Sequence, residues 1–439
     1  MRLVRRNRIW GAATAALLVC VAHAQSQNLT LEDALKLAAQ RNGDVRSAFL
    51  QAKSAHEGTN ISFAAFLPQI TPEYEYQSDR EQLKNLTGNG NSFVQTEAQT
   101  SAILSSWTLL DSGQREFNYS ASKRSEDAAR ASALETLRTV LFTVHQQYYD
   151  ALRAQELERV ADLQVQQTKT ILDQTTARAE LGDEAKKDTL QANADYLNAK
   201  VSLLSAKSNT AVATATLKAT IGYDRDQPLP PLVKPQEPTD FPTPPTLEQM
   251  VTDGLKNRQD IVAERDRVAA LHDQAESAWR DAGLSLSLDA TFDRDLSPDN
   301  FQSRTFTLLL SYPLFDGGAL RSQARQADYG FQSEQATLDQ LERTARSDIE
   351  SAYTTLSDDS QRVSAAKAAL DAAQTNYDAA VAAQKAGAAG TDVVTVLTAQ
   401  VSLVTAESNY VQAIYDYYIA AVDLRLVTGQ SIPGENLIK

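Results

Sequence analysis

Residues 111–182 begin DSGQREFNYS and end TTARAELG, and they decide the fold. Between Gly113 and Gly182 there is no proline and no glycine, so nothing in this stretch interrupts a helix. At a rise of 1.5 Å per residue, a helix of ~68 residues is roughly 100 Å long. No compact globular domain needs such a helix. We therefore interpret the rest of the chain as the segments that start this helix, reverse it and pair it.

The chain contains this arrangement twice. A second long stretch without proline runs from Gly318 to Gly390, and Gly318 follows Gly113 by 205 positions. Both glycines end a similar turn, Leu110-Asp111-Ser112-Gly113 in the first copy and Phe315-Asp316-Gly317-Gly318 in the second. The returning helices also end alike, at 217–222 and 424–429. We predict two copies of one unit: helix, β-hairpin, long helix, reversal and returning helix.

Alternation with a period of two residues predicts the β-hairpins. Residues 70–79 and 284–293 alternate apolar side chains with acidic or polar ones, as strands with two different faces do. Extended runs at 93–110 and 306–314 supply their partner strands. Pro68 ends the helix that begins at Leu29.

These patterns give a mainly α fold with a smaller β component, and they divide the chain along its length. The predicted divisions are a secretory signal peptide at 1–24, a first repeat at 25–227 with a β-hairpin at 69–110 and a helical hairpin at 113–222, a proline-rich linker at 228–245, a second repeat at 246–429 with a β-hairpin at 284–315 and a helical hairpin at 318–429, and a tail at 430–439.

Alanines recur every seven residues along the predicted hairpins. A sustained seven-residue period indicates a left-handed coiled coil, and small residues on its seam let the helix axes approach closely. Either these alanines only let the two helices of each hairpin pack closely, or several hairpins lie side by side around a hollow. The alanines are Ala192, Ala199, Ala206 and Ala213; Ala365, Ala372, Ala379 and Ala386; and Ala399, Ala406, Ala413 and Ala420.

The N-terminus indicates the compartment, and the charge balance indicates which partners are unsuitable. Residues 1–24 have a basic head, an apolar core and a small-residue cleavage site, so we expect export with a mature start near Gln25. The only cysteine, Cys20, lies in this segment, so the mature chain has no disulfide. Loss of the four arginines in 1–24 leaves 38 of 42 basic residues against 56 acidic ones, a net charge of −18. Such an acidic chain is a poor nucleic-acid binder.

The strands raise the question of a membrane. Four strands of about ten residues have the length that crosses a bilayer as a tilted barrel. Four strands cannot close a barrel, and an open edge in hydrocarbon leaves backbone groups unpaired at several kcal/mol each. Either the strands form a small soluble sheet under a helix, or several chains pool them. Three chains would supply twelve strands, with the acidic face toward water and the Leu, Phe and Tyr face toward lipid.

Catalytic signals are weak. The histidines of the expected mature chain, His56, His145 and His272, are isolated in the sequence and lie on predicted helices. No nucleophile-elbow, phosphate-loop or zinc-ligand spacing occurs. We therefore expect no enzyme, no metal site and no cofactor.

The order of these segments over the whole mature chain resembles the TolC-like outer-membrane efflux proteins of Gram-negative bacteria. The resemblance rests on the duplicated unit, the turns after Trp107–Leu110 and Tyr312–Phe315, and the helix ends at Ile221-Gly222 and Thr428-Gly429. It implies a homotrimer in outer-membrane lipid, with a twelve-stranded barrel continued by a periplasmic α-helical coiled-coil barrel. It also implies partners: a periplasmic adaptor and an inner-membrane pump of an efflux or type I secretion system.

The resemblance assigns roles to the two helix reversals. The tips that would contact an adaptor are Leu181, Gly182 and Asp183 in the first copy and Gly387 and Gly390 in the second, although these glycines also simply permit the turns.

Just inside the tips, the family narrows its tunnel with polar side chains. Asp188 matches an acidic entrance position, whereas Thr395 and Thr398 stand where the best-known members have two aspartates. Asp392 would then supply a single acidic ring, which favours cations near the entrance.

The function expected is a passive conduit that exports substrates through the outer membrane. The alternative is a secreted or periplasmic coiled-coil scaffold without a pore. A periplasmic adaptor also has a helical hairpin, but it would have one hairpin and no amphipathic strand pairs of this length.

Overall fold

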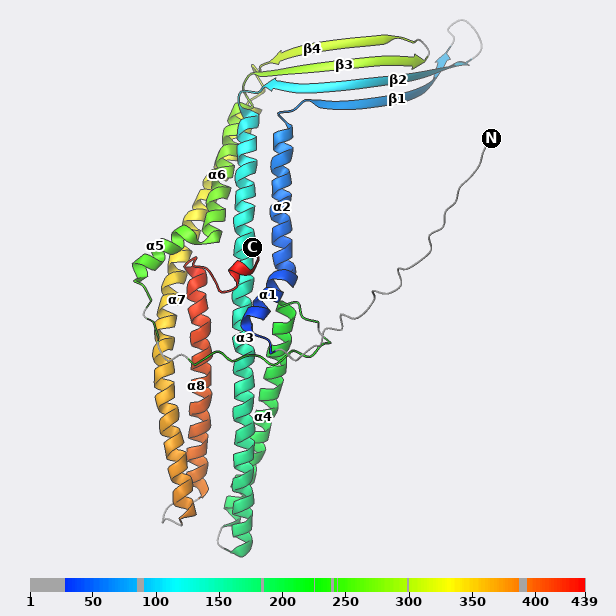
Figure 1. Cartoon of the computed structure of the whole chain (residues 1–439). Coiled ribbons are helices and arrows are strands. Elements are labelled where there is room, and N and C mark those ends of the chain that lie inside the picture. The colour runs from blue at the N-terminus through cyan, green and yellow to red at the C-terminus, as the bar shows by residue number, and fades with distance from the viewer. Residues whose placement is uncertain are drawn as a thin grey trace, which may run out of the picture.

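The computed structural model describes residues 28–84, 91–182, 185–224, 226–237, 241–242, 244–297, 300–386 and 393–438. Long helices run side by side, and a four-stranded sheet extends from one end of them (Figure 1). The elements of the first half are α1 (Leu31–Arg41), α2 (Gly43–Ala64), β1 (Gln69–Lys84), β2 (Asn91–Leu110), α3 (Gln114–Leu181) and α4 (Lys186–Thr220). Those of the second half are α5 (Leu247–Asn257), α6 (Gln259–Arg280), β3 (Ser285–Ser297), β4 (Gln302–Ser311), α7 (Ala319–Lys385) and α8 (Val393–Val427), followed by a 3₁₀ turn (Glu435–Ile438).

The first helical segment is two helices, which corrects the single helix predicted from Leu29 to Phe66. Asn42 adopts an extended backbone between α1 and α2, and its side-chain oxygen accepts from the amides of Asp44 and Val45. This is the N-cap arrangement that asparagine favours. The Asn42 side chain also donates to the Thr220 carbonyl at 3.1 Å, so it ties the break to the end of α4.

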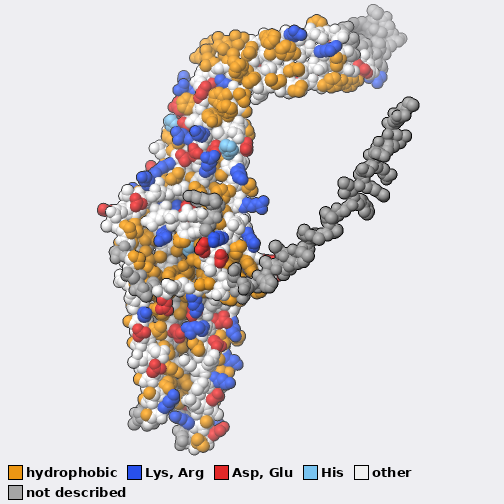
Figure 2. Space-filling view, viewed as in Figure 1, with side chains coloured by type: hydrophobic (Ala, Val, Ile, Leu, Met, Phe, Trp, Pro, Cys, Tyr) orange, Lys and Arg blue, Asp and Glu red, His pale blue; other side chains and the backbone are white. Residues whose placement is uncertain are grey.

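The sheet is an antiparallel meander in the order β1-β2-β3-β4. The two hairpins are joined by the pairing of β2 with β3, in which Trp107 lies opposite Leu288. β1 and β4 are therefore the two edges of the sheet. On the face seen in Figure 2, hydrophobic side chains cover much of the sheet, whereas charged side chains are scattered over the helices.

The helices form one layer with α3 at its centre. Near the sheet, α3 packs against α2 and α6, and α6 also packs against α7. Toward the far end, α3 packs against α4 and α8, and α8 packs against α7. The central helix has 20 buried residues, whereas the equally long α7 has 6. The layer thus ends in α2 and α4 on one side and in α7 on the other.

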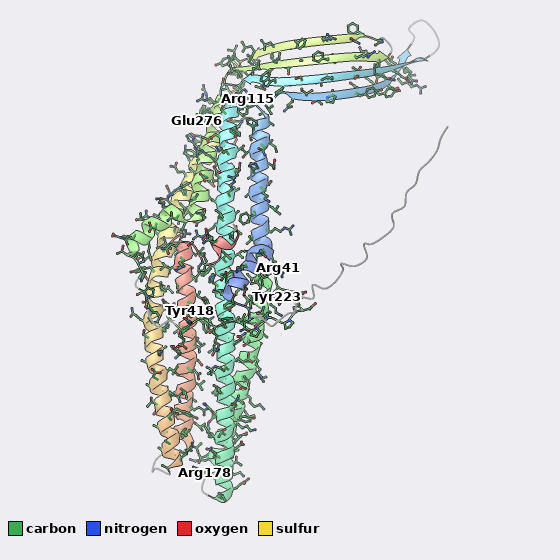
Figure 3. All side chains as sticks on the ribbon, in the orientation of Figure 1. Arg41, Arg115, Arg178, Tyr223, Glu276 and Tyr418 are labelled. Carbon is green, nitrogen blue, oxygen red and sulfur yellow. The ribbon has the colours of Figure 1, made fainter. Side chains whose placement is uncertain are left out.

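A single arginine fixes the junction between sheet and helices. The Arg115 guanidinium, in the first turn of α3, donates to the Asp111 carboxylate at 2.7 Å and to the Thr108 carbonyl at 2.6 Å. It also donates to the Ala65 carbonyl at the end of α2 and lies over the Phe66 ring, 5.1 Å from its centroid. One side chain therefore links the last residues of β2, the start of α3 and the end of α2 (Figure 3).

The proline-rich linker crosses the helices at mid-height. The Tyr148 hydroxyl accepts from the Val233 amide at 2.9 Å and lies 2.8 Å from the Leu29 carbonyl oxygen. The Tyr418 hydroxyl, labelled in Figure 3, donates to the Gln236 carbonyl, and Lys234 forms an ion pair with Glu156. The linker has no helix or strand of its own beyond one bridge between Leu29 and Leu232, within the parts of it that the structure describes. It is held as a band over α3 and α8.

Some of the repeated alanines are buried and others are exposed. Ala192 and Ala199 of α4 and Ala399 and Ala413 of α8 are buried. In contrast, the seven-residue repeat of α7 (Ala365, Ala372, Ala379 and Ala386) is exposed throughout. The seams inside the two hairpins are thus closed within one chain, whereas a coiled-coil face of α7 has no partner there.

Candidate functional site

The first helical hairpin ends in a glycine turn. Leu181, the last residue of α3, is 79% exposed, and Gly182 follows with a φ of 84°. The Gly182 amide donates to the Ala179 carbonyl at 3.2 Å, which closes the last turn of the helix. Arg178 lies at this end of the molecule, farthest from the sheet (Figure 3).

The predicted entrance residues lie just beyond the turns, on two different helices. Asp188 is in the first turn of α4, where its carboxylate lies 3.9 Å from the Lys187 ammonium and is 20% exposed. Thr395 and Thr398 both lie on the exposed face of α8, and the Thr398 hydroxyl donates to the Val394 carbonyl at 2.8 Å. The remaining predicted residues lie outside the described residues: Asp183, Gly387, Gly390 and Asp392.

An apolar cluster holds the four helices together just inside the tips. Ile171 of α3, Ala192 of α4 and Val393, Val396 and Leu397 of α8 are buried together. Tyr377 and Val381 of α7 pack against them. This cluster was not predicted from the sequence, although the spacing of Val393, Val396 and Leu397 at i, i+3 and i+4 is a helical apolar stripe that signals it.

Between this cluster and the sheet, the seam between the two hairpins has polar pairs as well as apolar contacts. Arg159 of α3 pairs with Glu407 of α8 at 2.8 Å. Nearer the tips, the Gln400 side-chain amide of α8 donates to the Gln167 side-chain oxygen of α3 at 3.2 Å. Gln400 is 1% exposed, and its own carbonyl oxygen has no partner among the described residues. A buried polar group left unpaired costs free energy, so this contact is weaker than a fully paired one.

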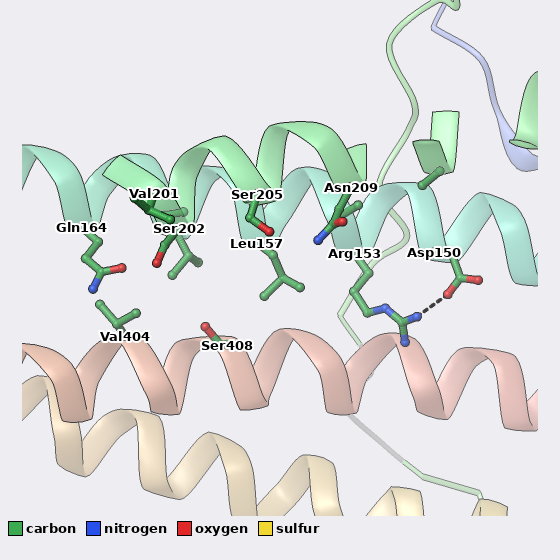
Figure 4. A pocket seen from close by; sticks show the side chains of 15 residues that line it. Asp150, Arg153, Leu157, Gln164, Val201, Ser202, Ser205, Asn209, Val404 and Ser408 are labelled. Carbon is green, nitrogen blue, oxygen red and sulfur yellow. Dashed lines mark hydrogen bonds and ion pairs between the residues drawn. The ribbon is translucent and has the colours of Figure 1, made fainter. Parts of the chain in front are cut away.

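A groove of about 690 Å³ runs along this seam (Figure 4). Arg153 extends across it from α3 and pairs with Asp150 of the same helix. Burial raises the pKa of Asp150, and the Arg153 charge opposes that effect. The walls of the groove come from α3, α4 and α8. They combine aliphatic side chains with hydroxyls and amides, including Leu157, Gln164, Val201, Ser202, Ser205, Asn209, Val404 and Ser408.

The three described histidines contact side chains or backbone of the helices. His56 of α2 lies 2.9 Å from the Glu126 carboxylate of α3, and His272 of α6 packs edge-on against Phe331 of α7. His145 is buried, with one ring nitrogen 2.9 Å from the Leu141 carbonyl oxygen. Within the described residues, no group of three or more His, Asp or Glu side chains is placed to hold a metal ion. Of the helices described, none combines the length and the apolar character that crossing a membrane requires.

The structure thus combines two long helical hairpins with a four-stranded sheet at one end and helix reversals at the other. Residues 34–223 and 251–430 match the family model for outer membrane efflux proteins, so the chain belongs to that family. It is an outer-membrane channel protein of the kind that serves efflux and type I secretion, with its helices on the periplasmic side.

Known relatives agree with this assignment. The chain is 25% identical to protein CyaE of Bordetella pertussis over 75% of this chain and 69% of that protein. It is 22% identical to outer membrane protein TolC of Escherichia coli over 79% of this chain and 72% of that protein. The solved outer membrane channel CmeC of Campylobacter jejuni has the same fold, with a TM-score of 0.80 and 17% identity over 91% of this chain and 85% of that one.

Proposed function

We propose that three copies of this chain close into a ring that conducts substrates passively across the outer membrane. The observation that carries the proposal is that the sheet and the helical layer are open at both sides. The sheet ends in β1 on one side and in β4 on the other, and the helices end in α2 and α4 on one side and in α7 on the other. A head-to-tail arrangement pairs the first side of one copy with the second side of the next, and it closes when the rotation completes a circle.

The edges of the sheet support closure into a twelve-stranded barrel. An unpaired strand edge is not stable in hydrocarbon, and pairing β4 of one copy with β1 of the next removes every edge. The outer strands carry exposed apolar side chains suited to lipid, including Ile70, Tyr74, Phe306, Leu308 and Leu310.

The edges of the helical layer are complementary in shape. Leu190, Leu197 and Leu204 of α4 follow a seven-residue repeat and are 63%, 51% and 68% exposed. The exposed alanine repeat of α7, residues 365–386, has the same period. Large side chains on one edge fit between small ones on the other, as knobs fit holes in a coiled coil. The ring of helices would continue the barrel as a periplasmic tunnel.

The tips are the proposed contact for a periplasmic adaptor and its inner-membrane pump. Leu181 and Gly182 present an exposed turn to such a partner; Asp183, Gly387 and Gly390 complete the proposed tip set. The chain has no phosphate-binding loop in its sequence, so the driving energy comes from the pump. Asp188, Asp392, Thr395 and Thr398 are the proposed entrance, and the helices there separate when the adaptor docks. We assign this protein conduction, not catalysis.

Purified full-length protein in planar bilayers tests the proposal. We expect a trimer by light scattering, retention in the membrane after carbonate washing, and discrete conductance steps. Cation preference should fall in the variant that combines Asp188→Ala with Asp392→Ala. A chain released by carbonate and silent in bilayers would instead be a periplasmic scaffold. Unchanged cation selectivity in the double variant would refute the entrance role alone.

A further inference from the structure

The two repeats dock their short helices on their long helices in the same way. α2 and α6 each have 22 residues, and their numbering differs by 216, as Gly43 and Gln259 show. His56 of α2 contacts Glu126 of α3 at 2.9 Å. Its counterpart His272 contacts Phe331 of α7 at a ring-centroid distance of 5.3 Å, and Phe331 follows Glu126 by 205 positions. The contact of α2 with α3 is therefore reproduced in the contact of α6 with α7.

The other side of α6 makes a second contact, with α3. The Asp273 carboxylate of α6 accepts from the Ser120 hydroxyl at 2.6 Å and from Arg124 at 3.2 Å. Ser277, one turn further along α6, is 4% exposed and donates to the Gln114 carbonyl at 3.3 Å. The long helix α3 thus carries a short helix on each side, α2 and α6. The long helix α7 carries α6 near the sheet and α5 further along, at Ile349 and Ala352. Among the described residues, the position beside α7 that matches the place of α6 on α3 is therefore open.

The repeat relation identifies what would meet at this open position. Counting back 216 positions from Asp273 gives Glu57 on α2, which keeps the acidic side chain. Counting forward 205 positions from Ser120 gives Arg325 on α7, which introduces a basic one. Both side chains are exposed. The Glu57 carboxylate accepts only from the Asn60 side chain at 3.0 Å, and Arg325 has no carboxylate within ion-pair distance among the described residues.

Large apolar side chains occupy neighbouring positions on the same two helices. Counting back 216 positions from the buried Ser277 gives Ile61, which is 73% exposed on α2. Counting forward 205 positions from Arg124 gives Tyr329, which is 66% exposed on α7. Two large apolar side chains are therefore uncovered on these helices: Ile61 at the place of the buried Ser277, and Tyr329 at the place of Arg124, which contacts Asp273. Burial of both would stabilise the contact by removing apolar surface from water.

We propose that α2 of one copy docks on α7 of the next copy in the register of the internal α6–α3 contact, with Glu57 paired to Arg325, Tyr329 beside Glu57, and Ile61 near Ala319. The inference rests on the proposed ring and adds to it the register in which the copies meet. α2 and α7 of one chain lie on opposite sides of the layer, separated by α3 and α6, so this contact forms only between copies. The opposite charges select the register, because a shift of one turn would separate them.

Cross-linking between cysteine pairs tests the register. In a Cys20→Ser background, we expect Glu57→Cys with Arg325→Cys to give covalent two-chain and three-chain products with a short bismaleimide. Ser120→Cys with Asp273→Cys reports the equivalent contact inside one chain, so it should react without forming multimers. Glu57→Cys with Arg346→Cys is the negative control, since Arg346 lies 21 residues further along α7, roughly 30 Å away.

Two results would overturn the inference, and they are distinguishable. A trimer by light scattering that yields no cross-linked multimers from the Glu57 and Arg325 pair refutes the register and leaves the ring intact. A monomer refutes both. Charge reversal adds a second measurement: Glu57→Arg should lower the temperature at which the purified trimer dissociates, and Arg325→Glu added to it should restore that temperature. Arg346→Glu in place of Arg325→Glu should not, and equal restoration by both would refute the pairing.

Discussion

Arg153 of α3 and Asp416 of α8 form a 2.7 Å ion pair across the seam between the two helical hairpins. The second carboxylate oxygen of Asp416 lies 3.6 Å from Arg362 of α7. The Asp416 carboxylate therefore faces a positively charged side chain from each of the two neighbouring helices. With the Arg159–Glu407 pair and the Gln167–Gln400 pair nearer the tips, it adds polar contacts to an α3–α8 seam that also has apolar ones, such as the stacked Tyr149 and Tyr418 rings. Inside each hairpin, the returning helix buries alanines: Ala192 and Ala199 of α4, and Ala399 and Ala413 of α8.

We predict that Asp416→Asn promotes opening of the tunnel. The substitution removes the charge that attracts Arg153 and Arg362 while keeping the size of the side chain. Partly exposed ion pairs contribute about 0.2–1 kcal/mol each. About 1 kcal/mol corresponds to roughly a five-fold change in an equilibrium. Single-channel recordings should therefore show opening events a few times more often. Asp378→Asn is the control, because among the described residues Asp378 accepts only from Gln374 of its own helix, at 3.1 Å. An equal effect in both variants would contradict the role of the seam.

A second prediction concerns pH and the contact between α6 and α7. Glu264 of α6 is buried, with one carboxylate oxygen 2.7 Å from Arg267 and the other without a partner among the described residues. Burial, and then the neighbouring Glu334 carboxyl of α7, raise the pKa of Glu264, while Arg267 opposes them. A raised pKa in the folded state means that the folded chain binds the proton more tightly than the unfolded chain. Its contribution to stability is present at low pH and is lost as the pH rises through the raised pKa.

Glu264→Gln should therefore raise the midpoint of thermal unfolding at pH 8 and leave it nearly unchanged at pH 4. Glutamine keeps the shape of the protonated carboxyl and cannot ionise. Glu342→Gln is the control, because Glu342 pairs with Arg265 at 2.7 Å across the same two helices. Loss of that pair should give no gain at pH 8. A gain from Glu264→Gln that is equally large at pH 4 would rule out proton linkage as its cause.

Much of the architecture followed from periodicity and turns. The alternation at 284–293 and 306–314 predicted a hairpin at 284–315, and the strands observed are Ser285–Ser297 and Gln302–Ser311. The repeat and the turn sequences led to a family resemblance that the family match confirms. These features depend on neighbouring residues in the chain, so a single sequence contains them.

Contacts between distant segments were not predictable in this way. The residues near Asn42 do not indicate that its side chain will reach Thr220, 178 positions later. They therefore do not predict that the break between α1 and α2 is tied to the end of α4. The linker composition predicted an extended segment but not the tyrosines that hold it against α3 and α8. For the same reason, the apolar cluster inside the tips was missed, since Ile171 and Val396 are brought together only by the fold.

A third prediction concerns the junction between the sheet and the helices. Arg115→Lys should weaken the junction almost as much as Arg115→Ala, because lysine lacks the planar fork that reaches a carboxylate and several carbonyls together. Asp111, 9% exposed, would lose its main partner. Hydrogen bonds that involve a charged group contribute about 1.5–3 kcal/mol each. We expect a lower dissociation temperature of the trimer in detergent. Arg321→Ala, an exposed position in the first turn of α7, should have little effect. Full stability of the lysine variant would contradict the proposed geometry.

A fourth prediction uses the glycines that end the returning helices. Gly222 and Gly429 have φ angles of 64° and 68°, a region that side chains disfavour. A Cβ added at Gly429 would lie 2.7 Å from the Arg258 amide nitrogen, and one added at Gly222 would lie 2.7 Å from the Arg41 Cβ. Both returning helices thus end directly against the break between a pair of short helices.

Gly429→Ala should therefore destabilise the chain by about 1–3 kcal/mol through backbone strain and the contact with Arg258. Gly58→Ala is the opposite control: it lies inside α2 with no atom within 4 Å of the added Cβ, and alanine should favour the helix by about 0.5–1 kcal/mol. Chemical denaturation of the two variants in parallel measures both effects. If Gly429→Ala is as stable as the unsubstituted chain, then the helix end can move away from Arg258, and the two copies of the unit are not anchored at their short helices.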